Sequence, residues 1–183
     1  FVEAADKRMY TSDNDSVFYR GYPRQVGVEM ATGDWIGYVD SDDFILKDAV
    51  SGRILAEQGA DERVAPASIT KIMTGYVVAD QIDKGFISAD EEVFISENCW
   101  RKGGSKMFIK EGSRVLVSDL IKGMVIQSGN DASCALAEHT AGSEEGFVDL
   151  MMVYVRDLGL DNTNFVNVWG GTDSEHYSTA RDL

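Results

Sequence analysis

A serine and a lysine stand three residues apart in the stretch APASITKIMT, residues 65–74. In a helix, positions i and i+3 lie on one face, so the Ser68 hydroxyl and the Lys71 ammonium would be neighbours. A serine hydroxyl becomes an effective nucleophile when an adjacent base takes its proton, and a desolvated lysine, partly neutral, can be that base. The same spacing also suits the start of an ordinary amphipathic helix. Taken alone, the pair leaves both interpretations open.

A second polar group lies in the stretch IQSGNDAS, residues 126–133. Here Ser128 and Asn130 occupy a Ser-Gly-Asn turn between two predicted helices. A polar turn between apolar helices can place a hydroxyl and an amide over the start of a neighbouring helix. The ordinary alternative is helix capping by Ser128, Asn130 or Asp131.

The two histidines offer a competing serine chemistry. His139 lies in the middle of an Ala-rich segment, and His176 lies in a loop with serine and glutamate neighbours. A Ser-His-Asp triad of the hydrolase type would place its serine in a G-x-S-x-G turn, and neither histidine has such a partner. The sequence therefore favours the lysine over a histidine as the base.

An acidic cluster follows a predicted strand in ATGDWIGYVDSDD, residues 31–43. Residues 24–44 resemble a segment of the family 2 glycosyltransferases, in which A-x-G precedes a strand that ends in an Asp-x-Asp motif. That resemblance implies a divalent metal on Asp40, Asp42 and Asp43, together with a sugar nucleotide. The ordinary alternative is a solvated acidic turn, and we expect no catalytic metal there.

Composition limits the classes of partner. The 183 residues, enough for one sizeable core, carry 17 basic and 31 acidic side chains, a net charge of −14. This balance argues against binding to nucleic acid or to an anionic membrane. No stretch approaches the ~18 apolar residues of a membrane span. The chain begins at Phe1 without a signal peptide, so we expect it to be a piece of a longer product.

Two cysteines, Cys99 and Cys134, could pair or stay free. They lack C-x-x-C spacing, which disfavours a metal site. Because free cysteine is among the most buried residue types, the sequence favours two buried thiols.

Hydrophobic periodicity and turn residues predict a mixed α/β (α+β) chain. The expected elements are a strand at 35–39, a hairpin at 44–58 around Ser51-Gly52, a helix from Pro66 to Gly85, a strand at 92–96, a helix from a Ser118 cap to Gln127, an Ala-rich helix ending at Gly142, a helix opened by Ser143 and ending at Gly159, and a final helix capped by Ser178 or Thr179.

Together, S-x-x-K at residues 68–71 and S-x-N at residues 128–130 resemble the first two motifs of the serine penicillin-binding proteins and β-lactamases. The resemblance extends to SGRILAEQGADERVAPASITKIMT, GGSKMFIKEGSRVLVSDLIKGMVIQSGNDASCALAEHTAGS and YSTARDL. These segments look like the low-molecular-mass D-alanyl-D-alanine carboxypeptidases of peptidase family S11. The resemblance implies that residues 44–183 are the N-terminal part of a DD-peptidase/β-lactamase-like domain, truncated at its C-terminus. Residues 1–43 would be a leader of unrelated character.

The resemblance also implies roles for the four polar residues. Ser68 would be the nucleophile that attacks the peptide bond between the two D-alanines of a peptidoglycan stem pentapeptide, and its backbone N–H would be half of an oxyanion hole. Lys71 would be the general base, and Ser128 would relay a proton to the leaving amine. Asn130 would hold the substrate amide and orient Lys71. The family needs no metal or organic cofactor, is inhibited by β-lactam antibiotics, and works in the periplasm or another extracytoplasmic space.

Two departures from the family pattern bear on activity. The third motif, K-T-G, occurs nowhere in these 183 residues. The family's His-Gly-Leu segment corresponds here to Trp169-Gly170-Gly171. We therefore expect a serine-type carboxypeptidase with impaired activity, and the alternatives are a non-catalytic penicillin-binding module or a glycosyltransferase remnant.

Overall fold

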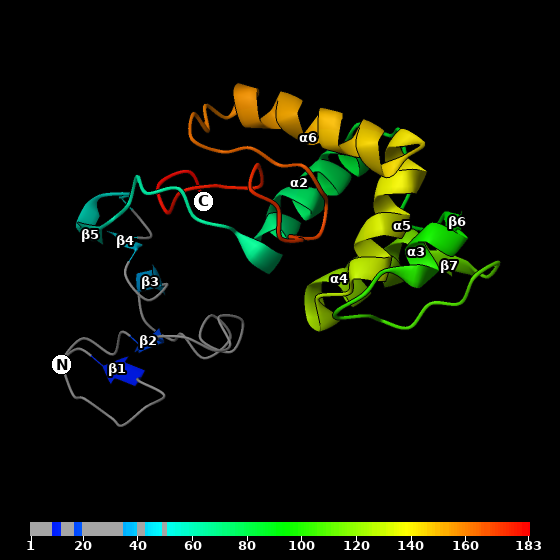
Figure 1. The fold of residues 1–183 in the computed structure, drawn as a ribbon, viewed down its shortest axis with the longest axis horizontal. Helices are drawn as coiled ribbons and strands as arrows, with labels where there is room; N and C mark the ends of the chain where they lie inside the picture. The colour runs from blue at the N-terminus through cyan, green and yellow to red at the C-terminus, as the bar shows by residue number, and fades with distance from the viewer. Residues whose placement is uncertain (1–8, 12–16, 20–34, 40–42, 49–50) are drawn as a thin grey trace. The chain divides into compact units, whose positions relative to one another are not determined.

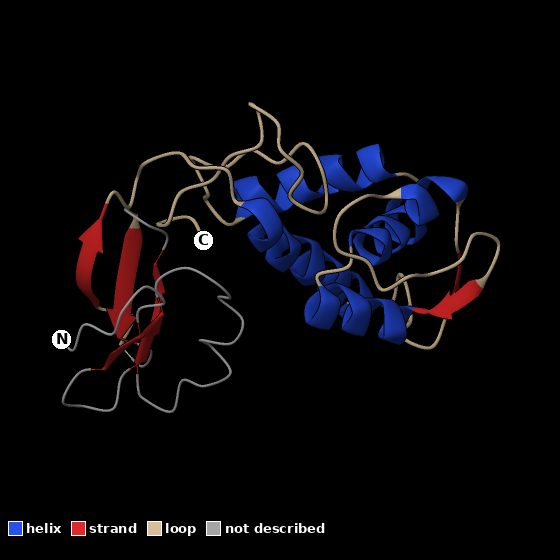
Figure 2. Ribbon diagram, turned by 60° about the horizontal axis from the view of Figure 1, so that its bottom comes forward, coloured by secondary structure: helices blue, strands red, loops and turns tan. Residues whose placement is uncertain are grey.

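The computed structural model describes residues 9–11, 17–19, 35–39, 43–48 and 51–183. The chain divides into two compact units, which are described separately below. The first comprises residues 1–63 with 179–183, and the second comprises residues 64–178. Figure 2 colours the helices and strands of both units.

The described strands of the first unit are antiparallel. Strand β1 (Met9–Thr11) pairs with β2 (Val17–Tyr19), and β3 (Trp35–Val39), β4 (Phe44–Asp48) and β5 (Ile54–Gln58) form a sheet in the order β3-β4-β5. The predicted strand at 35–39 and the predicted hairpin are therefore confirmed. At the hairpin turn, Gly52 adopts φ +68°, a conformation that glycine reaches without steric cost.

The second unit is mainly helical and carries the candidate catalytic residues (Figure 1). Its elements are the 3₁₀ turn η1 (Ala67–Ile69), α2 (Thr70–Asp83), β6 (Glu92–Phe94), α3 (Glu97–Arg101), β7 (Arg114–Leu116), α4 (Val117–Gln127), α5 (Asn130–Ala141) and α6 (Glu144–Asp157). Strands β6 and β7 form an antiparallel pair. The mixed α/β class predicted from the sequence agrees with this arrangement.

Helix α5 is the centre of the second unit. It packs against α2, α3, α4, α6 and β6. Every residue from Asn130 to Ala137 is buried. The small side chains of Ala132, Ala135 and Ala137 let neighbouring helices approach closely, and the large side chains of Phe147 and Phe165 complete the core around them. The start of α5, where the S-x-N turn lies, is therefore held in a closely packed core.

The helix ends test the capping predictions. Ser143 caps α6, because its hydroxyl accepts a hydrogen bond from the N–H of Gly146 at 3.0 Å. Gly142 ends α5 in the left-handed conformation, as predicted. The predicted Ser118 cap is wrong: α4 already begins at Val117, and the capping position is Leu116 without a side-chain hydrogen bond. Here strand β7 runs directly into α4, so the chain enters the helix without a capping side chain.

The predicted final helix is also wrong. Ser178 instead forms an isolated β-bridge with Val64, and residues 180–182 form a turn. Thr179 does receive a hydrogen bond on its hydroxyl from the N–H of Asp182, at 3.1 Å, so the predicted cap closes only one turn. A single turn fixes many dihedrals for few hydrogen bonds, which is why short helices rarely form alone. Among the described helices, none is both long and apolar enough to cross a membrane.

Candidate active site

Ser68 lies in the 3₁₀ turn that leads into α2. The turn begins after buried Pro66, whose carbonyl accepts a hydrogen bond from the N–H of Ile69 at 3.0 Å. Ser68 itself is exposed. The preceding residue, Ala67, adopts φ +47°. This left-handed conformation is energetically unfavourable for any residue that has a Cβ atom. Such strain persists only where neighbouring structure enforces it, and it concentrates at functional sites.

Lys71 is buried beside this serine. The residue is only 8% exposed, and Nζ lies 3.5 Å from Ser68 Oγ and 2.7 Å from the backbone carbonyl oxygen of Trp169. Burial lowers the pKa of Lys71 from 10.5 to about 8, because desolvation disfavours the ammonium. A measurable fraction of the lysine is therefore neutral near pH 7, and a neutral amine can accept a proton.

The loop that supplies the Trp169 carbonyl is organised by Asn167. Asn167 Oδ1 accepts hydrogen bonds from the backbone N–H groups of Trp169, Gly170 and Gly171, at 3.3, 2.7 and 2.8 Å. Gly170 has φ +89°, and a Cβ atom there would lie 1.8 Å from the carbonyl oxygen of Ala67. The loop thus packs directly on the peptide that precedes the serine. Sequence reasoning missed Asn167, although an asparagine shortly before Gly-Gly is a typical turn signal.

Ser128 and Asn130 lie at the junction of α4 and α5. Both helices pack against α2, the helix that carries Lys71. Ser128 ends α4 in the left-handed conformation, and its hydroxyl oxygen is buried without a hydrogen-bond partner among the residues that the structure describes. The side-chain amide of Asn130 donates to the carbonyl of Gly103 at 2.8 Å. Neither side chain is a helix cap, and within the described chain neither is hydrogen-bonded to Ser68 or Lys71.

Asp131 attaches the loop before β7 to the start of α5. Its carboxylate is fully buried and accepts hydrogen bonds from the backbone N–H groups of Met107, Phe108 and Ile109, at 3.0, 2.9 and 3.2 Å. A buried carboxylate needs such donors to replace water. The same loop contributes the Gly103 carbonyl that holds the Asn130 amide. The capping interpretation of Asp131 is therefore incomplete, because the carboxylate mainly binds a distant loop.

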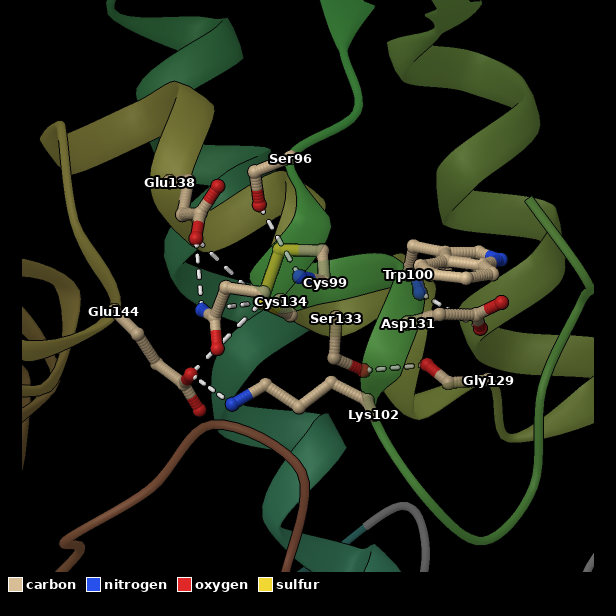
Figure 3. The surroundings of a disulfide bond; sticks show 12 residues. Ser96, Cys99, Trp100, Lys102, Gly129, Asp131, Ser133, Cys134, Glu138 and Glu144 are labelled. Atoms are coloured by element: carbon tan, nitrogen blue, oxygen red, sulfur yellow. Dashed lines mark hydrogen bonds and ion pairs between the residues drawn. A yellow bond between two sulfur atoms is a disulfide. The ribbon is translucent and has the colours of Figure 1, made fainter. Parts of the chain in front are cut away.

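A disulfide between Cys99 and Cys134 joins α3 to α5 (Figure 3). Cys99 and Cys134 are both fully buried, but the expectation of two free thiols is wrong, since their sulfurs are bonded. Two carboxylates and a cation surround the disulfide. Lys102 Nζ lies 2.5 Å from a carboxylate oxygen of Glu144, and the carboxylate of Glu138 lies beside the sulfurs. Bonded sulfurs are not thiolate ligands, so this cluster does not offer a thiolate metal site in its oxidised form.

The histidines have other partners. His139 Nε2 lies 2.8 Å from a carboxylate oxygen of Glu91. His176 is buried; its Nδ1 accepts from the Val166 N–H at 3.1 Å, so Nε2 carries the proton directed at Thr70 Oγ1, 2.7 Å away. Burial lowers the pKa of His176, which favours this neutral form. These hydrogen bonds go to groups other than Ser68, which agrees with the sequence-based preference for lysine.

The structure describes only one of the three aspartates in the acidic cluster at residues 40–43. Asp40 and Asp42 lie outside the described residues, and Asp43 is half-buried. The absence of a catalytic metal at this cluster stays a prediction.

With this geometry in view, comparison with known proteins identifies the family. Residues 29–183 match the sequence profile of the D-alanyl-D-alanine carboxypeptidases of peptidase family S11. The chain belongs to this family. It is 46% identical over 151 residues to D-alanyl-D-alanine carboxypeptidase DacC of Escherichia coli, an alignment that covers 79% of this chain and 38% of DacC. It is 43% identical over 139 residues to DacF of Bacillus subtilis, covering 76% of this chain and 36% of DacF. The chain thus spans less than two-fifths of the length of these curated relatives.

Solved structures of S11 carboxypeptidases and related enzymes share the fold. The D-alanyl-D-alanine carboxypeptidase DacD from Francisella tularensis superposes with a TM-score of 0.76 at 44% identity, covering 79% of this chain and 35% of that one. Penicillin-binding protein 5 from Haemophilus influenzae superposes with a TM-score of 0.75 at 43% identity, covering 77% of this chain and 42% of that one. The Streptomyces K15 DD-transpeptidase superposes with a TM-score of 0.66 at 31% identity, covering 73% of this chain and 53% of that one.

These matches confirm the resemblance to the S11 carboxypeptidases and place the chain in the DD-peptidase fold. The profile match begins at residue 29, upstream of the predicted boundary between residues 43 and 44, and that boundary stays a prediction. The glycosyltransferase resemblance of residues 24–44 finds no support among these proteins.

Proposed function

We propose that Ser68 is the acylating nucleophile of a serine-type D-Ala-D-Ala carboxypeptidase that acts on peptidoglycan stem pentapeptides. The observation that supports this most directly is the environment of Lys71. A lysine that is 8% exposed, with a pKa near 8 and its Nζ 3.5 Å from a serine hydroxyl, has the properties of a general base for that serine.

In the proposed reaction, neutral Lys71 takes the proton of the Ser68 hydroxyl as Oγ attacks the carbonyl carbon between the two D-alanines. The Ser68 backbone N–H stabilises the oxyanion of the tetrahedral intermediate. The C–N bond then breaks, and the leaving amine of D-alanine receives a proton through the Ser128 hydroxyl, which is buried and has no competing partner in the described chain. Water finally hydrolyses the acyl-enzyme ester and restores the serine.

Asn130 would hold the substrate rather than take part in bond breaking. One N–H of its side-chain amide is bound to Gly103, which fixes the orientation of the amide. Its Oδ1 would then accept the N–H of the substrate peptide. In the same proposal Asn130 also orients Lys71, a contact that forms once substrate is bound.

The proposal extends to inhibitors and location. A β-lactam ring presents an amide carbonyl to the same serine, so penicillins should acylate Ser68. Because peptidoglycan lies outside the cytoplasmic membrane, we place the protein's site of action in the periplasm or another extracytoplasmic space.

The third family motif limits the rate that we expect from the 183-residue chain. These residues contain no K-T-G, whose strand in the family would supply the second oxyanion donor and a cation for the substrate carboxylate. Removing one oxyanion donor lowers kcat by about 10²–10³-fold, and removing the cation that holds the carboxylate adds to that. We propose that the 183-residue chain turns over slowly or not at all.

The test compares four proteins: the 183-residue chain, the same chain extended through a strand that carries K-T-G, and the extended chain with either Ser68→Ala or Ser51→Ala. Release of D-alanine from diacetyl-lysyl-D-Ala-D-Ala and covalent labelling by a fluorescent penicillin are measured for each. We expect activity and labelling in the extended chain and neither in its Ser68→Ala variant. The exposed hairpin serine variant Ser51→Ala is the matched control and should leave both unchanged.

Each alternative has its own signature in this experiment. Labelling that persists in Ser68→Ala would contradict the nucleophile, and equal turnover with and without the K-T-G strand would contradict the expected impairment. Labelling of Ser68 without D-alanine release would indicate a non-catalytic penicillin-binding module. Micromolar Mn²⁺ binding that strengthens with a sugar nucleotide would instead favour the glycosyltransferase remnant.

A further inference from the structure

We infer that Asn167 is a positioning residue for the acylation step, because it shapes the loop whose backbone holds both Lys71 and the peptide before Ser68. The kinetic part of this inference rests on the proposed function, whereas the structural part concerns Lys71 alone and is tested without activity.

Three hydrogen bonds converge on one atom of Asn167. Asn167 Oδ1 accepts from three successive backbone N–H groups, those of Trp169, Gly170 and Gly171. The Asn167 amide nitrogen closes the loop from its far end by donating to the Gly171 carbonyl at 3.1 Å. These bonds fix the peptide planes of residues 169–171, and hence the direction of the Trp169 carbonyl.

The Trp169 carbonyl holds the amine of Lys71. Trp169 O lies 2.7 Å from Lys71 Nζ, whereas Ser68 Oγ lies 3.5 Å away. The shorter hydrogen bond is the stronger one, so the carbonyl, more than the serine, determines where the lysine nitrogen lies. A shift of the carbonyl would therefore change the distance over which the proton must move.

The same loop also contacts the backbone that holds the nucleophile. A Cβ atom on Gly170 would lie 1.8 Å from Ala67 O and 2.9 Å from Ser68 N, so the loop backbone touches the peptide that holds the serine. Thr74 attaches the start of this loop to α2, since its hydroxyl donates a hydrogen bond to the carbonyl of Val168, the residue before Trp169, at 2.7 Å. The base and the nucleophile's peptide are thus both positioned by one loop, which Asn167 organises.

The side-chain chemistry provides matched variants. Asn167→Ala removes the acceptor, whereas Asn167→Asp keeps a carboxylate oxygen for the three N–H groups. Asn164 is the control because it is an asparagine of the same segment whose side chain donates elsewhere, to the Glu175 carbonyl at 2.6 Å. Asn164→Ala should disturb the segment without moving the Trp169 carbonyl.

The first measurement is the pKa of Lys71 in the 183-residue chain, followed by NMR of ¹³C-labelled lysine. The Trp169 carbonyl favours the ammonium, so its displacement in Asn167→Ala should lower the Lys71 pKa further below about 8. Asn164→Ala should leave it unchanged. A pKa that is unchanged in Asn167→Ala, or that rises toward 10.5, overturns the inference, because the loop would then not hold Nζ through this carbonyl.

The second measurement is the rate of penicillin labelling in the chain extended through K-T-G. Misplacing a catalytic group by an ångström costs about 10²-fold, and we expect Asn167→Ala to slow acylation by about that factor without weakening the initial binding. Asn167→Asp should recover most of the rate, and Asn164→Ala should match the parent. If Asn167→Ala and Asn164→Ala reduced the labelling rate equally, the role of Asn167 would be merely structural, and the inference would be overturned.

Failure of the proposed function and failure of the inference about Asn167 are distinguishable. If the chain extended through K-T-G is not labelled at Ser68, the proposed function is wrong, and the NMR result still decides whether Asn167 positions Lys71. Thermal unfolding of each variant identifies one that does not fold. Should Asn167→Ala be that variant, Asn167→Gln carries the test, because its longer side chain keeps an amide but moves the oxygen away from the three N–H groups. The same decrease in the Lys71 pKa is then expected, and an unchanged pKa overturns the inference.

Discussion

At the scale of single residues, Lys71 should make acylation depend on pH. An ammonium cannot accept the serine proton, and burial lowers the pKa of this lysine to about 8. We therefore expect the labelling rate of the K-T-G-extended chain to rise about tenfold per pH unit below that value and to level off above it. Labelling rates across this range check the prediction, and a rate independent of pH would show that Lys71 is not the base.

The same residue should couple folding to pH. The unfolded lysine titrates near its ordinary 10.5 and the folded one near 8, so between these values the unfolded chain binds more protons. The contribution of Lys71 to the free energy of unfolding should then increase as pH rises from about 8 toward 10.5, and it should be constant below that window. Thermal unfolding of the parent and of Lys71→Met measures this, because the variant should lack the increase.

What the sequence could predict at this scale was the chemistry carried by side chains. The i, i+3 spacing was enough to propose Ser68 beside Lys71, and a polar turn drew attention to Ser128 and Asn130. The backbone contributions were not predictable, because the Trp169 carbonyl and the left-handed Ala67 have no side-chain signature. Asn167 did carry a turn signal, but its role was missed because it acts by ordering the backbone of other residues.

At the scale of elements, the disulfide between α3 and α5 should be a main source of stability. It closes a loop across a sequence separation of 35 residues, and a cross-link of that span raises the free energy of unfolding by about 4 kcal/mol in the chain-entropy model. We expect reduction of the parent to lower its denaturant midpoint, and the variant Cys99→Ala with Cys134→Val to unfold at the reduced parent's midpoint. A parent that responds to reductant no more than this variant would show that the bond is not formed.

Most elements followed from periodicity, and the errors have physical causes. Apolar stripes and glycine stops located α2, α5 and α6, because those signals are local. The disulfide was not predictable from spacing, since Cys99 and Cys134 meet only when α3 packs on α5. Ser118 failed as a cap because a strand leads directly into α4, which is a matter of tertiary structure.

At the scale of the whole molecule, the sequence identified the family but not the limits of its units. The S-x-x-K and S-x-N motifs lie 60 residues apart, and only packing around α5 brings their helices into one unit. The unit boundary at residues 63 and 64, and the return of residues 179–183 to the first unit, depend on contacts between distant segments. No local pattern encodes such contacts.

The location of the core leads to a prediction about residues 1–43. The main hydrophobic cluster consists of residues between Met73 and Val168, all in the second unit, so we expect its burial not to need the N-terminal segment. A chain that starts at Phe44 keeps β4, β5 and that cluster. Its midpoint of thermal unfolding should stay within about 3 °C of the parent's, the shift that roughly 1 kcal/mol produces in a chain of this size.

A second truncation is the control for this prediction. A chain that starts at Gly85 lacks α2, and with it the buried side chains of Met73, Val77 and Val78. Removing them exposes the faces of α5 and α6 that α2 covers, so this chain should lose its cooperative transition. Calorimetry of the three chains decides the matter. If the chain that starts at Phe44 also loses cooperative unfolding, residues 1–43 contribute to the core, and the boundary predicted between residues 43 and 44 is wrong.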